Sequence, residues 1–430
     1  MYKLYTFILY LLTPFIIIRL LWLGIKNPAF WQRWNERFGF INAVADKRPV
    51  IWIHAVSVGE VHASKPIINY LLESWAQYQI LITTTTPTGA NSIAMTYGNA
   101  VTHLYFPYDL PGSVRRFVTT LKPQILIVME TELWPNLFKY CKSCDIPVLL
   151  VNARMSEKSA NGYARLKKLT GLTLADLSKI VAQTTEDANR LIQLGASKND
   201  IIISGNLKFD VTLPHSLREQ AQSLRRSFSV NRAVIIAAST HEGEEEQILD
   251  GFSSILKKYP DCLLILAPRH PERFDSVYNL CVKQGYNTVR HQFNEVCLDS
   301  TQIYLLDTLG ELPMFYAASD IAFIGGSLVP KGGQNVLEPA SLGLPILVGP
   351  YTFNFLEINR QLVEQGNAWI IKDSNQFAEK VGELLADANL RHQAGEKGKQ
   401  MVEKNRGSSS KVIKLLDKML GDATSSGISI

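Results

Sequence analysis

The sequence predicts an α/β protein with two doubly wound domains, preceded by an apolar helix at its amino terminus. Short apolar runs rich in β-branched residues alternate with helical stretches, which is typical of parallel sheets covered on both faces. These runs form two sets, and a length of 430 residues suits two or three domains at roughly 100–200 residues each. An uncharged apolar segment, Leu4–Ile18, precedes both sets.

The composition is that of a globular protein, with 46 % hydrophobic and 19 % charged residues. It excludes wholesale disorder, collagen and coiled coil. Five cysteines form an odd set, which indicates reduced thiols in a compartment like the cytoplasm. Cys141 and Cys144 make a lone CxxC without a second pair, so we expect two ordinary thiols there rather than a zinc or redox site.

The net charge of +5 is concentrated at the start of the chain, where the first 40 residues carry five Lys and Arg against Glu36. A protein that binds nucleic acid would spread basic charge along a face, and no such stripe is visible. A cationic head beside an apolar segment favours a membrane surface as partner and argues against nucleic acid.

The apolar amino-terminal stretch, Tyr5–Leu23, predicts a membrane anchor over residues 1–25. A spanning helix needs roughly 20 apolar residues, and this stretch reaches that length only by including Arg19. Pro14 would kink the helix. A cleaved signal peptide fits poorly, because no small-residue cleavage site follows. A buried core helix is the other alternative. The anchor is either a short span or a helix lying in the interface.

An aromatic and cationic belt follows this segment, formed by Trp22, Trp31, Trp34, Arg33 and Arg37. Such belts lie at the membrane–water interface, and basic residues favour the cytoplasmic side. We therefore expect the remainder of the chain in the cytoplasm.

Each predicted domain contains its own set of strands. The first domain spans 26–210 and the second 231–405, with a linker over 211–230, a hinge in the turn-rich Gly205–Pro214, and a terminal helix and tail over 406–430. The expected strands are Val50–Ala55, Ile80–Thr84, Val101–Phe106, Ile125–Met129, Val148–Val151 and Ile180–Ala182, then Ala233–Ala238, Cys262–Ala267, Asn287–Arg290, Gln302–Leu306, Ile321–Ile324, Pro345–Val348 and Ala368–Ile371.

Ligands of open α/β sheets bind outside the carboxyl ends of the strands, so the residues that follow each strand are the candidate site. Ser57 and Gly59 after the first strand suit a tight turn, and Glu60 would open the next helix. Glu60 is either a first-turn acid that the helix dipole favours or a general base. The dipole would lower its pKa and keep it ionised.

The fourth and fifth strands are also followed by charged residues. Glu130 and Glu132 lie two residues apart, and at least one of them is expected to be functional, although Glu132 can also be read as a helix-start acid. Arg154 could meet an anionic ligand or form a surface ion pair. Lys208 lies in the predicted hinge, where a lysine is usually solvated, so spacing alone supports its function weakly.

In the second domain, Ser239 and Glu242 have capping-box spacing, and the acidic run Glu242–Glu246 is most simply a helix start with a solvated face. In the next loop, Pro268 and Pro271 limit flexibility. Arg269 can direct two hydrogen bonds at a phosphate or carboxylate, and we favour this over a purely structural loop.

The strongest local signal is the glycine-rich segment Gly325–Ala340, which follows a strand and precedes a helix. Glycines let the backbone approach an anion, and the helix amino terminus supplies N–H donors. The candidates here are Gly326, Ser327, Lys331, Gly332 and Gly333. Glu338 could accept hydrogen bonds from ribose hydroxyls, or it could be a helix-start acid.

Two common metal motifs are absent from the sequence. It contains no Asp-x-Asp, which often holds a metal for nucleotide diphosphates, and no HExxH.

Seven segments together resemble the bacterial 3-deoxy-D-manno-octulosonic acid (Kdo) transferases of lipopolysaccharide assembly. They are HAVSVGEVHAS from His54, METELWPN from Met129, NARMSEKS from Asn152, GNLKFD from Gly205, ASTHEGEEE from Ala238, APRHPER from Ala267 and GGSLVPKGGQNVLEPA from Gly325. Their order along essentially the whole chain makes the resemblance specific.

The resemblance implies a GT-B glycosyltransferase, with two Rossmann-like domains across a cleft and the acceptor domain first. It implies that Glu60 is the catalytic base and that Glu130 and Lys208 support the transition state. The segments that resemble the CMP-binding ones are Pro268 and Arg269, then Leu309, Gly310 and Glu311, then Asn335, Val336, Leu337 and Glu338. From the residues alone, Leu309–Glu311 reads as a loop before a helix.

By the same resemblance, the enzyme transfers Kdo from CMP-Kdo to a phosphorylated lipid A precursor at the cytoplasmic face of the inner membrane. One phosphodiester charge can be held without a metal, so no cofactor is expected. A UDP-sugar transferase, a sugar-nucleotide 2-epimerase and a non-enzymatic nucleotide-binding scaffold are the alternatives. The number of Kdo residues transferred stays open.

Overall fold

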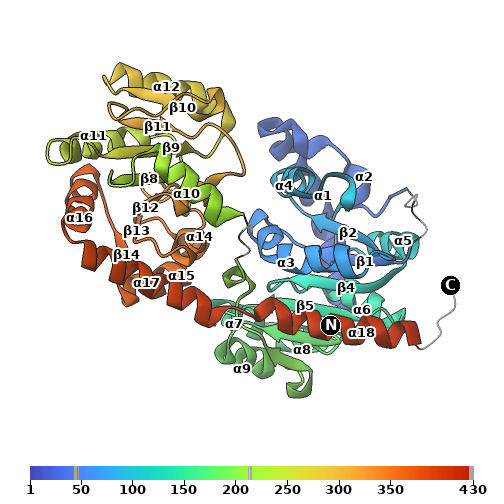
Figure 1. The fold of residues 1–430 in the computed structure, drawn as a ribbon. Coiled ribbons are helices and arrows are strands. Elements are labelled where there is room, and N and C mark those ends of the chain that lie inside the picture. The colour runs from blue at the N-terminus through green and yellow to red at the C-terminus, as the bar shows by residue number, and fades with distance from the viewer. Residues whose placement is uncertain (43–45, 47, 212, 214–215, 426–430) are drawn as a thin grey trace. The chain divides into compact units, whose positions relative to one another are not determined.

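The computed structural model describes residues 1–42, 46, 48–211, 213 and 216–425. The chain forms two compact units: Met1–Asp210 together with the stretch from Arg406, and Val211–Asn405 (Figure 1). Both are α/β, which confirms the predicted fold class. Two positions of the expected hinge, Thr212 and Pro214, lie outside the described residues.

Within its described residues, unit 1 contains a parallel sheet of seven strands in the order β3-β2-β1-β4-β5-β6-β7. The six predicted strands are all present. β7 was missed, although its three consecutive isoleucines are β-branched residues that favour a strand. The strands are β1 Val50–His54, β2 Gln79–Thr84, β3 Thr102–Tyr105, β4 Pro123–Met129, β5 Val148–Ala153, β6 Lys179–Ala182 and β7 Ile201–Ile203.

Helices cover both faces of this sheet. The α-helices are α1 Tyr2–Lys26, α2 Trp34–Arg37, α3 Val58–Ser74, α4 Pro87–Tyr97, α5 Pro111–Leu121, α6 Pro135–Ser143, α7 Glu157–Ala164, α8 Lys167–Leu174, α9 Thr185–Gln193 and α18 Ser408–Ser425, and the short 3₁₀ helices are η1 Pro28–Trp31, η2 Gly98–Ala100, η3 Lys198–Asp200 and η4 Leu207–Phe209.

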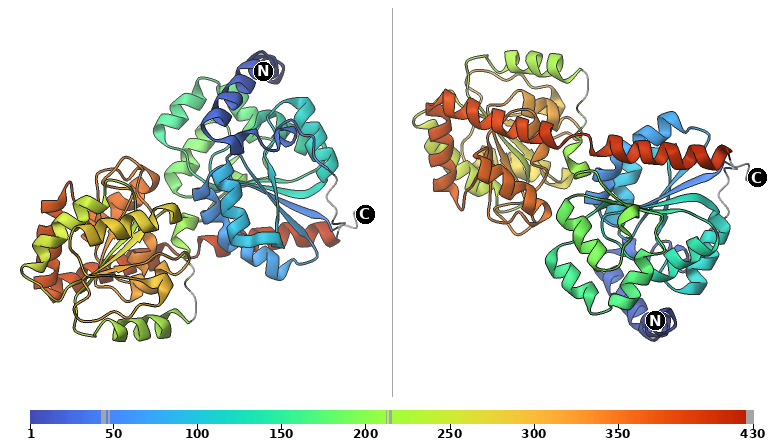
Figure 2. Two further views of the ribbon diagram at one scale, coloured as in Figure 1. Left: turned by 90° about the horizontal axis from the view of Figure 1, so that it is seen from above. Right: turned by 90° about the horizontal axis from the view of Figure 1, so that it is seen from below.

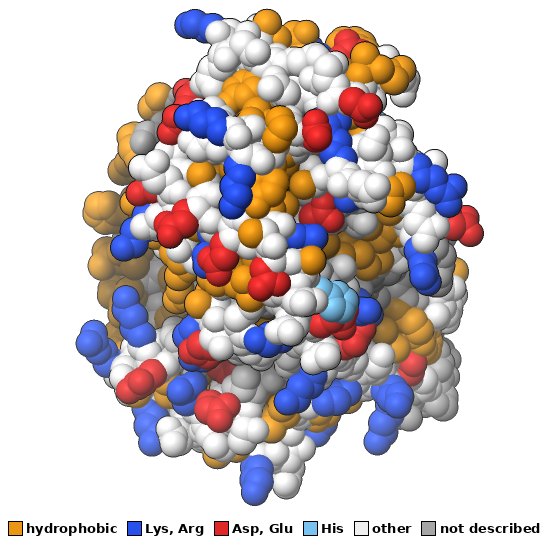
Figure 3. Space-filling view, turned by 60° about the vertical axis from the view of Figure 1, so that its left-hand side comes forward, with side chains coloured by type: hydrophobic (Ala, Val, Ile, Leu, Met, Phe, Trp, Pro, Cys, Tyr) orange, Lys and Arg blue, Asp and Glu red, His pale blue; other side chains and the backbone are white. Residues whose placement is uncertain are grey.

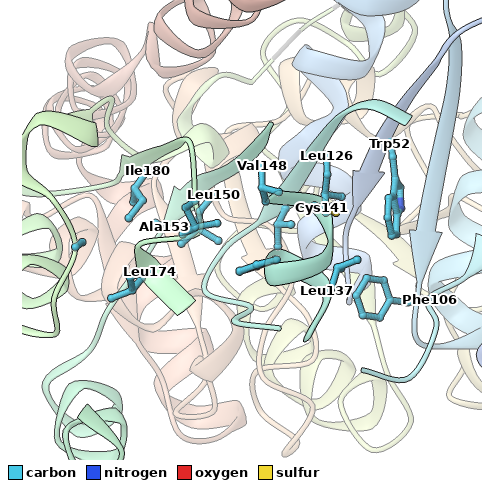
Figure 4. Packing of buried hydrophobic residues seen from close by; sticks show 14 of the residues in the cluster. Trp52, Phe106, Leu126, Leu137, Cys141, Val148, Leu150, Ala153, Leu174 and Ile180 are labelled. Atoms are coloured by element: carbon cyan, nitrogen blue, oxygen red, sulfur yellow. The ribbon is translucent and has the colours of Figure 1, made fainter. Parts of the chain in front are cut away.

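The core of unit 1 has two layers because alternate side chains of each strand point to opposite faces of the sheet. Trp52 lies in one layer, while Ile51 and Ile53 lie in the other. Figure 4 shows Trp52 beside Phe106 in the first layer. Both layers are dry, which explains why these strands read as continuous apolar runs.

Cys141 belongs to this buried layer, and burial raises the pKa of its thiol to about 12 (Figure 4). Cys144 is exposed, and both are free cysteines. A buried thiol with a raised pKa is unreactive, so the reading of this CxxC as two ordinary thiols fits the structure.

The expected carboxyl-terminal helix is present as α18, and it packs on unit 1 (Figures 1 and 2). Val412, Leu416 and Leu420 enter the second core layer. Asp417 accepts hydrogen bonds from the Tyr70 hydroxyl at 2.8 Å and from the indole of Trp75 at 3.0 Å. The apolar stripe of α18 therefore closes the core of the first unit.

The first turns of helix α1 are tied to unit 1. Tyr2 donates a hydrogen bond to Asp176 at 2.5 Å, and Thr6 donates to Asn136 at 2.9 Å. Beyond its other end, Arg33 donates to the backbone oxygen of His103 at 2.5 Å. Both ends of the helix are thus held by the same unit, so α1 lies along it.

A continuous apolar stripe is exposed along α1. Its members recur every three or four residues and are each 52–71 % exposed: Leu4, Phe7, Leu11, Phe15, Ile18, Trp22 and Ile25. Among the described helices, α1 alone is apolar and long enough, over Tyr2–Ile25, to cross a membrane by length and composition. We call these seven side chains the α1 stripe.

Unit 2 contains, within its described residues, a second parallel seven-stranded sheet in the order β10-β11-β9-β8-β12-β13-β14. All its strands were predicted. They are β8 Val234–Thr240, β9 Leu263–Pro268, β10 Thr288–Arg290, β11 Ile303–Leu305, β12 Ile321–Ile324, β13 Ile346–Val348 and β14 Ala368–Ile370.

The helices of unit 2 begin inside the stretch that was expected to be a linker, because α10 belongs to this unit. They are α10 Leu217–Ser227, α11 Glu245–Leu256, α12 Phe274–Lys283, α13 Leu312–Ala317, α14 Leu337–Ser341, α15 Leu356–Gln365, α16 Ser374–Ala386 and α17 Ala388–Asn405, with 3₁₀ helices η5 Pro271–Arg273, η6 His291–Phe293 and η7 Phe353–Phe355. On the face drawn in Figure 3, acidic and basic side chains are interspersed.

Candidate active site

Glu60 lies in the first turn of α3, directly after the carboxyl end of β1. Its carboxylate accepts a hydrogen bond from the Val56 backbone N–H at 2.7 Å and another from the Ser57 hydroxyl at 2.9 Å. Ser57 also caps the helix by accepting from the Glu60 N–H at 3.3 Å. Gly59 lies inside α3, so the tight turn expected there is wrong. These contacts orient a carboxylate that is only 6 % exposed.

The pKa of Glu60 is raised to about 7, first by burial and then by the nearby charge of Glu130. This corrects the expectation that the helix dipole would lower it. Burial removes water from the carboxylate, and this cost outweighs both its hydrogen bonds and its place at a helix start. A carboxylate with a pKa near neutrality is a stronger base than an ordinary glutamate.

Glu130 follows β4 with a left-handed backbone, at φ 54°, which is uncommon for a residue other than glycine. Its Oε1 lies 3.2 Å from the Nζ of Lys208. Sequence reasoning placed Lys208 in the hinge, but η4 belongs to unit 1. The fold therefore brings together two residues that are 78 positions apart.

Asn152 positions this lysine, although sequence reasoning gave it no role. It lies in β5 with φ 59°, and its side-chain oxygen accepts the Leu207 N–H at 3.0 Å. Asn206 then accepts the Lys208 N–H at 3.0 Å. The sequence signal for this role was an asparagine near the end of an apolar strand, because Asn tolerates the left-handed backbone conformation.

Glu132 is a third carboxylate in this group. Burial and then Glu130 raise its pKa to about 7. It precedes α6, which begins only at Pro135, so the interpretation as a helix-start acid is wrong. Trp134 packs against Phe106 with ring centroids 4.9 Å apart, as expected of a core residue. The carboxyl edge of the first sheet thus gathers three glutamates and one lysine.

Arg154 lies at the same edge, just after β5. Its side chain is exposed, and its backbone N–H donates to the Thr131 hydroxyl at 3.0 Å. The surface ion pair considered for it is not among the ion pairs of the described residues. An exposed guanidinium here remains available to an anionic ligand.

The glycine-rich loop of unit 2 follows β12 and needs its glycines for steric reasons. A Cβ on Gly325 would lie 2.3 Å from the backbone oxygen of Ser239. Gly332 has a left-handed backbone, and a Cβ there would meet the ring of Phe353 at 2.4 Å. Gly326 and Gly333 also have positive φ angles, of 69° and 74°. The loop is therefore held in one conformation against its neighbours.

Glu244 braces this loop from inside. Its buried carboxylate accepts backbone N–H bonds from His241, Gly326, Ser327 and Leu328 at 2.7–3.0 Å. The solvated acidic face predicted for Glu242–Glu246 is thus wrong for Glu244, and also for Glu245, which is buried and pairs with Arg273 at 2.6 Å. An acidic run at a helix start gave no hint of this, because the partners are about 82 residues further on.

Ser327 has a similar bracing role. Its hydroxyl donates to the Ile324 backbone oxygen and accepts from the Gly349 N–H at 2.7 Å. The side chain is fully buried. Its polar atoms are occupied within the loop, so it does not present a hydroxyl to a ligand in this arrangement.

Basic side chains gather at the same edge of unit 2. The His241 and His270 rings lie 5.2 Å apart, and the pKa of His241 is lowered to about 4 by burial and then by His270, Lys331 and Arg269. Pro268 ends β9 and fixes the start of the loop that carries Arg269. Burial is the main cause of this lowered pKa, but the contributions of Lys331 and Arg269 show that two cations lie near the ring, and such a region suits an anion.

The helix expected after the glycine-rich loop is short. α14 has five residues, and Asn335, which precedes the N-cap residue Val336, accepts the Leu337 N–H at 3.0 Å. The other end of the Asn335 amide donates to Glu338 at 3.1 Å. Val336 is buried beneath the loop. A single turn has a weaker dipole than a long helix, so we expect the neighbouring cations to provide most of the attraction for an anion.

Leu309, Gly310 and Glu311 form a loop before α13, as the residues alone predicted. Leu309 is 48 % exposed, and Gly310 has φ 91°. Glu311 accepts a hydrogen bond from Thr308 and lies 3.1 Å from Nε2 of His291. Among the residues that the structure describes, no group of three or more His, Cys, Asp or Glu side chains could hold a metal ion.

Comparisons with known proteins agree over both units. A family model described as 3-deoxy-D-manno-octulosonic-acid transferase (kdotransferase) matches residues 32–211, and one described as glycosyl transferases group 1 matches residues 234–401. A 3-deoxy-D-manno-octulosonic acid transferase from Haemophilus influenzae is 40 % identical over 96 % of this chain and 97 % of its own length. A protein of the same name from Bordetella pertussis is 33 % identical over 93 % and 96 %.

One solved structure is similar to this chain in its fold only. It is UDP-GlcNAc 2-epimerase from Neisseria meningitidis bound to UDP-GlcNAc, with a TM-score of 0.51 and 16 % identity, over 83 % of this chain and 98 % of that one.

Proposed function

The chain belongs to the 3-deoxy-D-manno-octulosonic acid (Kdo) transferase family and is a glycosyltransferase, and we propose that it transfers Kdo from CMP-Kdo to the lipid A precursor (lipid IVA) with inversion. The observation that carries the proposal is the carboxylate of Glu60, which two hydrogen bonds orient at the carboxyl edge of the first sheet and which has a pKa of about 7. This is the kind of group that can accept a proton from an acceptor hydroxyl at neutral pH.

In the proposed mechanism, the acceptor hydroxyl oxygen attacks the anomeric carbon of Kdo and its proton passes to Glu60. The bond from that carbon to the phosphate oxygen breaks, and CMP leaves with the bonding electrons. Inversion at the carbon follows from direct displacement, which needs a base and no covalent nucleophile. Glu60 accepts one proton in each transfer and must lose it before the next.

We assign Lys208 to the negative charge of the reacting groups. It could neutralise either the Kdo carboxylate or the leaving phosphate, and its ion pair with Glu130 holds the ammonium in place. Charge develops on the phosphate as the glycosidic bond breaks, so a fixed cation there would help the transition state more than the ground state.

We assign donor binding to unit 2. CMP-Kdo carries a single phosphodiester charge, which Arg269 and Lys331 could meet beside the glycine-rich loop. Glu338, one of whose oxygens is held by Asn335, would accept hydrogen bonds from the ribose hydroxyls. A single charge can be met by these cations, so we propose that transfer needs no metal. Leu309–Glu311 would complete the CMP site by family resemblance.

We propose that the enzyme lies at the cytoplasmic face of the inner membrane, with α1 in the interface rather than across the bilayer. The α1 stripe is too apolar and too continuous for an ordinary soluble surface. A spanning position would break the hydrogen bonds of Tyr2 and Thr6 to the unit. A phosphorylated glycolipid in the same membrane would then be presented at high effective concentration.

The function is tested by the mass of the product after the full-length protein is incubated with CMP-Kdo and tetraacylated lipid A precursor. We expect a mass gain equal to one or more Kdo residues, and the same gain when a chelator is present. The size of the gain counts the sugars. No gain while CMP still binds would overturn the assignment of Kdo transfer to this acceptor. Loss of the gain in chelator would overturn metal independence alone.

The pH profile of kcat/KM reports on the same carboxylate. Because a base must be unprotonated, the rate should rise about tenfold per pH unit up to pH 7 and then level off. The raised pKa also means that the folded protein binds this proton more tightly than the unfolded chain does. The contribution of Glu60 to the free energy of unfolding should therefore fall as the pH rises from 4.5 to about 7. A profile whose midpoint lies near 4.5, the ordinary value for glutamate, would contradict the assignment of Glu60 as base.

A further inference from the structure

A groove of about 580 Å³ lies between α1, α5 and α6, and none of its lining residues is among those assigned to catalysis. We call it the α1 groove. Phe7 and Tyr10 from α1 line one side, with Pro111 from α5 and Tyr140 from α6 on the other. Phe7 also belongs to the α1 stripe, so the groove is continuous with that apolar surface.

Three cations stand around this apolar lining. Lys3 comes from α1, Arg115 from α5 and Lys139 from α6, and all three are exposed. The ammonium of Lys139 lies 4.6 Å from the centre of the Tyr2 ring. Three elements thus contribute one positive charge each to a single groove.

The two neighbouring acids form no ion pair with these three cations among the described residues. Asp109 is buried and accepts the backbone N–H groups of Asn136 and Leu137 at 3.0 and 2.8 Å. Asp176 accepts the Tyr2 hydroxyl and pairs with Lys142 at 3.1 Å. The groove therefore combines an apolar wall with a cationic mouth.

We propose that the α1 groove binds one acyl chain of an anionic phospholipid, whose phosphate contacts Lys3, Arg115 and Lys139. Its volume is within the range of small-molecule sites, and its lining suits a hydrocarbon chain. Clustered Lys and Arg beside an apolar membrane-facing helix attract anionic headgroups. A lipid in this place would hold α1 against α5 and α6. The inference goes beyond Kdo transfer and needs neither substrate for its test.

The first experiment is flotation of the full-length protein with phosphatidylcholine vesicles, with and without phosphatidylglycerol. The double variant Arg115→Glu, Lys139→Glu should bind phosphatidylglycerol vesicles at least about tenfold more weakly than the wild type. The matched control is Lys158→Glu, Lys198→Glu, which changes the charge equally at exposed lysines of the same unit. It should change binding less than about twofold. An equal loss in both double variants would overturn the proposal in favour of diffuse charge attraction.

The second experiment locates the chain with a phosphatidylglycerol that carries a photoreactive acyl chain. Labelling should fall on the segments of α5 and α6 that line the groove. Ser143→Trp should fill the groove and abolish this labelling, whereas Ser227→Trp should not. The two serines are matched, since each ends an α-helix and donates to the backbone oxygen three residues earlier, at 2.7 Å. Labelling confined to the α1 stripe, or unchanged in Ser143→Trp, would overturn the acyl-chain assignment.

Discussion

Replacement of Glu60 by glutamine should lower kcat for Kdo transfer by about 100- to 10,000-fold, the range typical of a lost general base. Glutamine keeps the size of the side chain and can still accept the Val56 N–H, but it cannot take the hydroxyl proton. The affinity for CMP should not change, because the residues assigned to the nucleotide lie in the other unit. Steady-state kinetics and calorimetric CMP titration measure the two quantities separately.

Stability provides the control for this variant. Burial raises the pKa of Glu60, which means that its ionised form destabilises the folded protein at pH 8. The uncharged glutamine should therefore leave the thermal stability at pH 8 unchanged or raise it. Glu157→Gln, at an exposed acid in the first turn of another helix of unit 1, should keep full activity. If Glu60→Gln retained normal kcat, the base would have to be sought among Glu130 and Glu132.

The second large effect is expected at Glu244, which touches no substrate in our scheme. Glu244→Gln would remove charge-assisted hydrogen bonds to four backbone N–H groups and turn an amide N–H toward two of them. We expect the free energy of unfolding of unit 2 to fall by about 3 kcal/mol or more, since bonds to charged groups contribute about 1.5–3 kcal/mol each. CMP affinity should fall at least about tenfold as the loop loosens, which corresponds to about 1.4 kcal/mol.

The control for the loop is Glu246→Gln on the same helix. Glu246 is exposed, so its replacement should change neither the melting temperature nor CMP binding. Denaturant titration and calorimetry would compare the two variants. If Glu244→Gln melted earlier but bound CMP normally, the glycine-rich loop would not depend on this brace, and Glu244 would be a stability residue only.

Strand prediction succeeded wherever both faces of a sheet are buried. Most of these strands are uniformly apolar. Of the 14 strands among the described residues 13 were found, including β3 and β10, which contain Thr, His or Arg and are only partly buried. The exception, Ile201–Ile203, is short and lies at the edge of the first sheet. Its three consecutive isoleucines favour a strand, so the sequence did carry a signal for it.

The candidate residues themselves could be selected from sequence, because parallel strands bring their carboxyl ends to one edge. Their ionisation could not. The dipole argument for Glu60 considered only its own helix, whereas burial and Glu130 raise its pKa to about 7. The partner of Lys208 could not be predicted from the sequence either. The Glu130–Lys208 ion pair forms only because the fold brings the end of β4 close to η4.

The sequence alone determined the fold class, the family resemblance and the positions of the candidate residues, since each depends on local patterns of apolar, turn and charged residues. The tertiary structure decided what surrounds those residues: the buried brace at Glu244, the raised pKa of Glu60 and the course of α1 along its unit. Burial and electrostatic coupling depend on neighbours distant in the chain, and only packing brings those neighbours together.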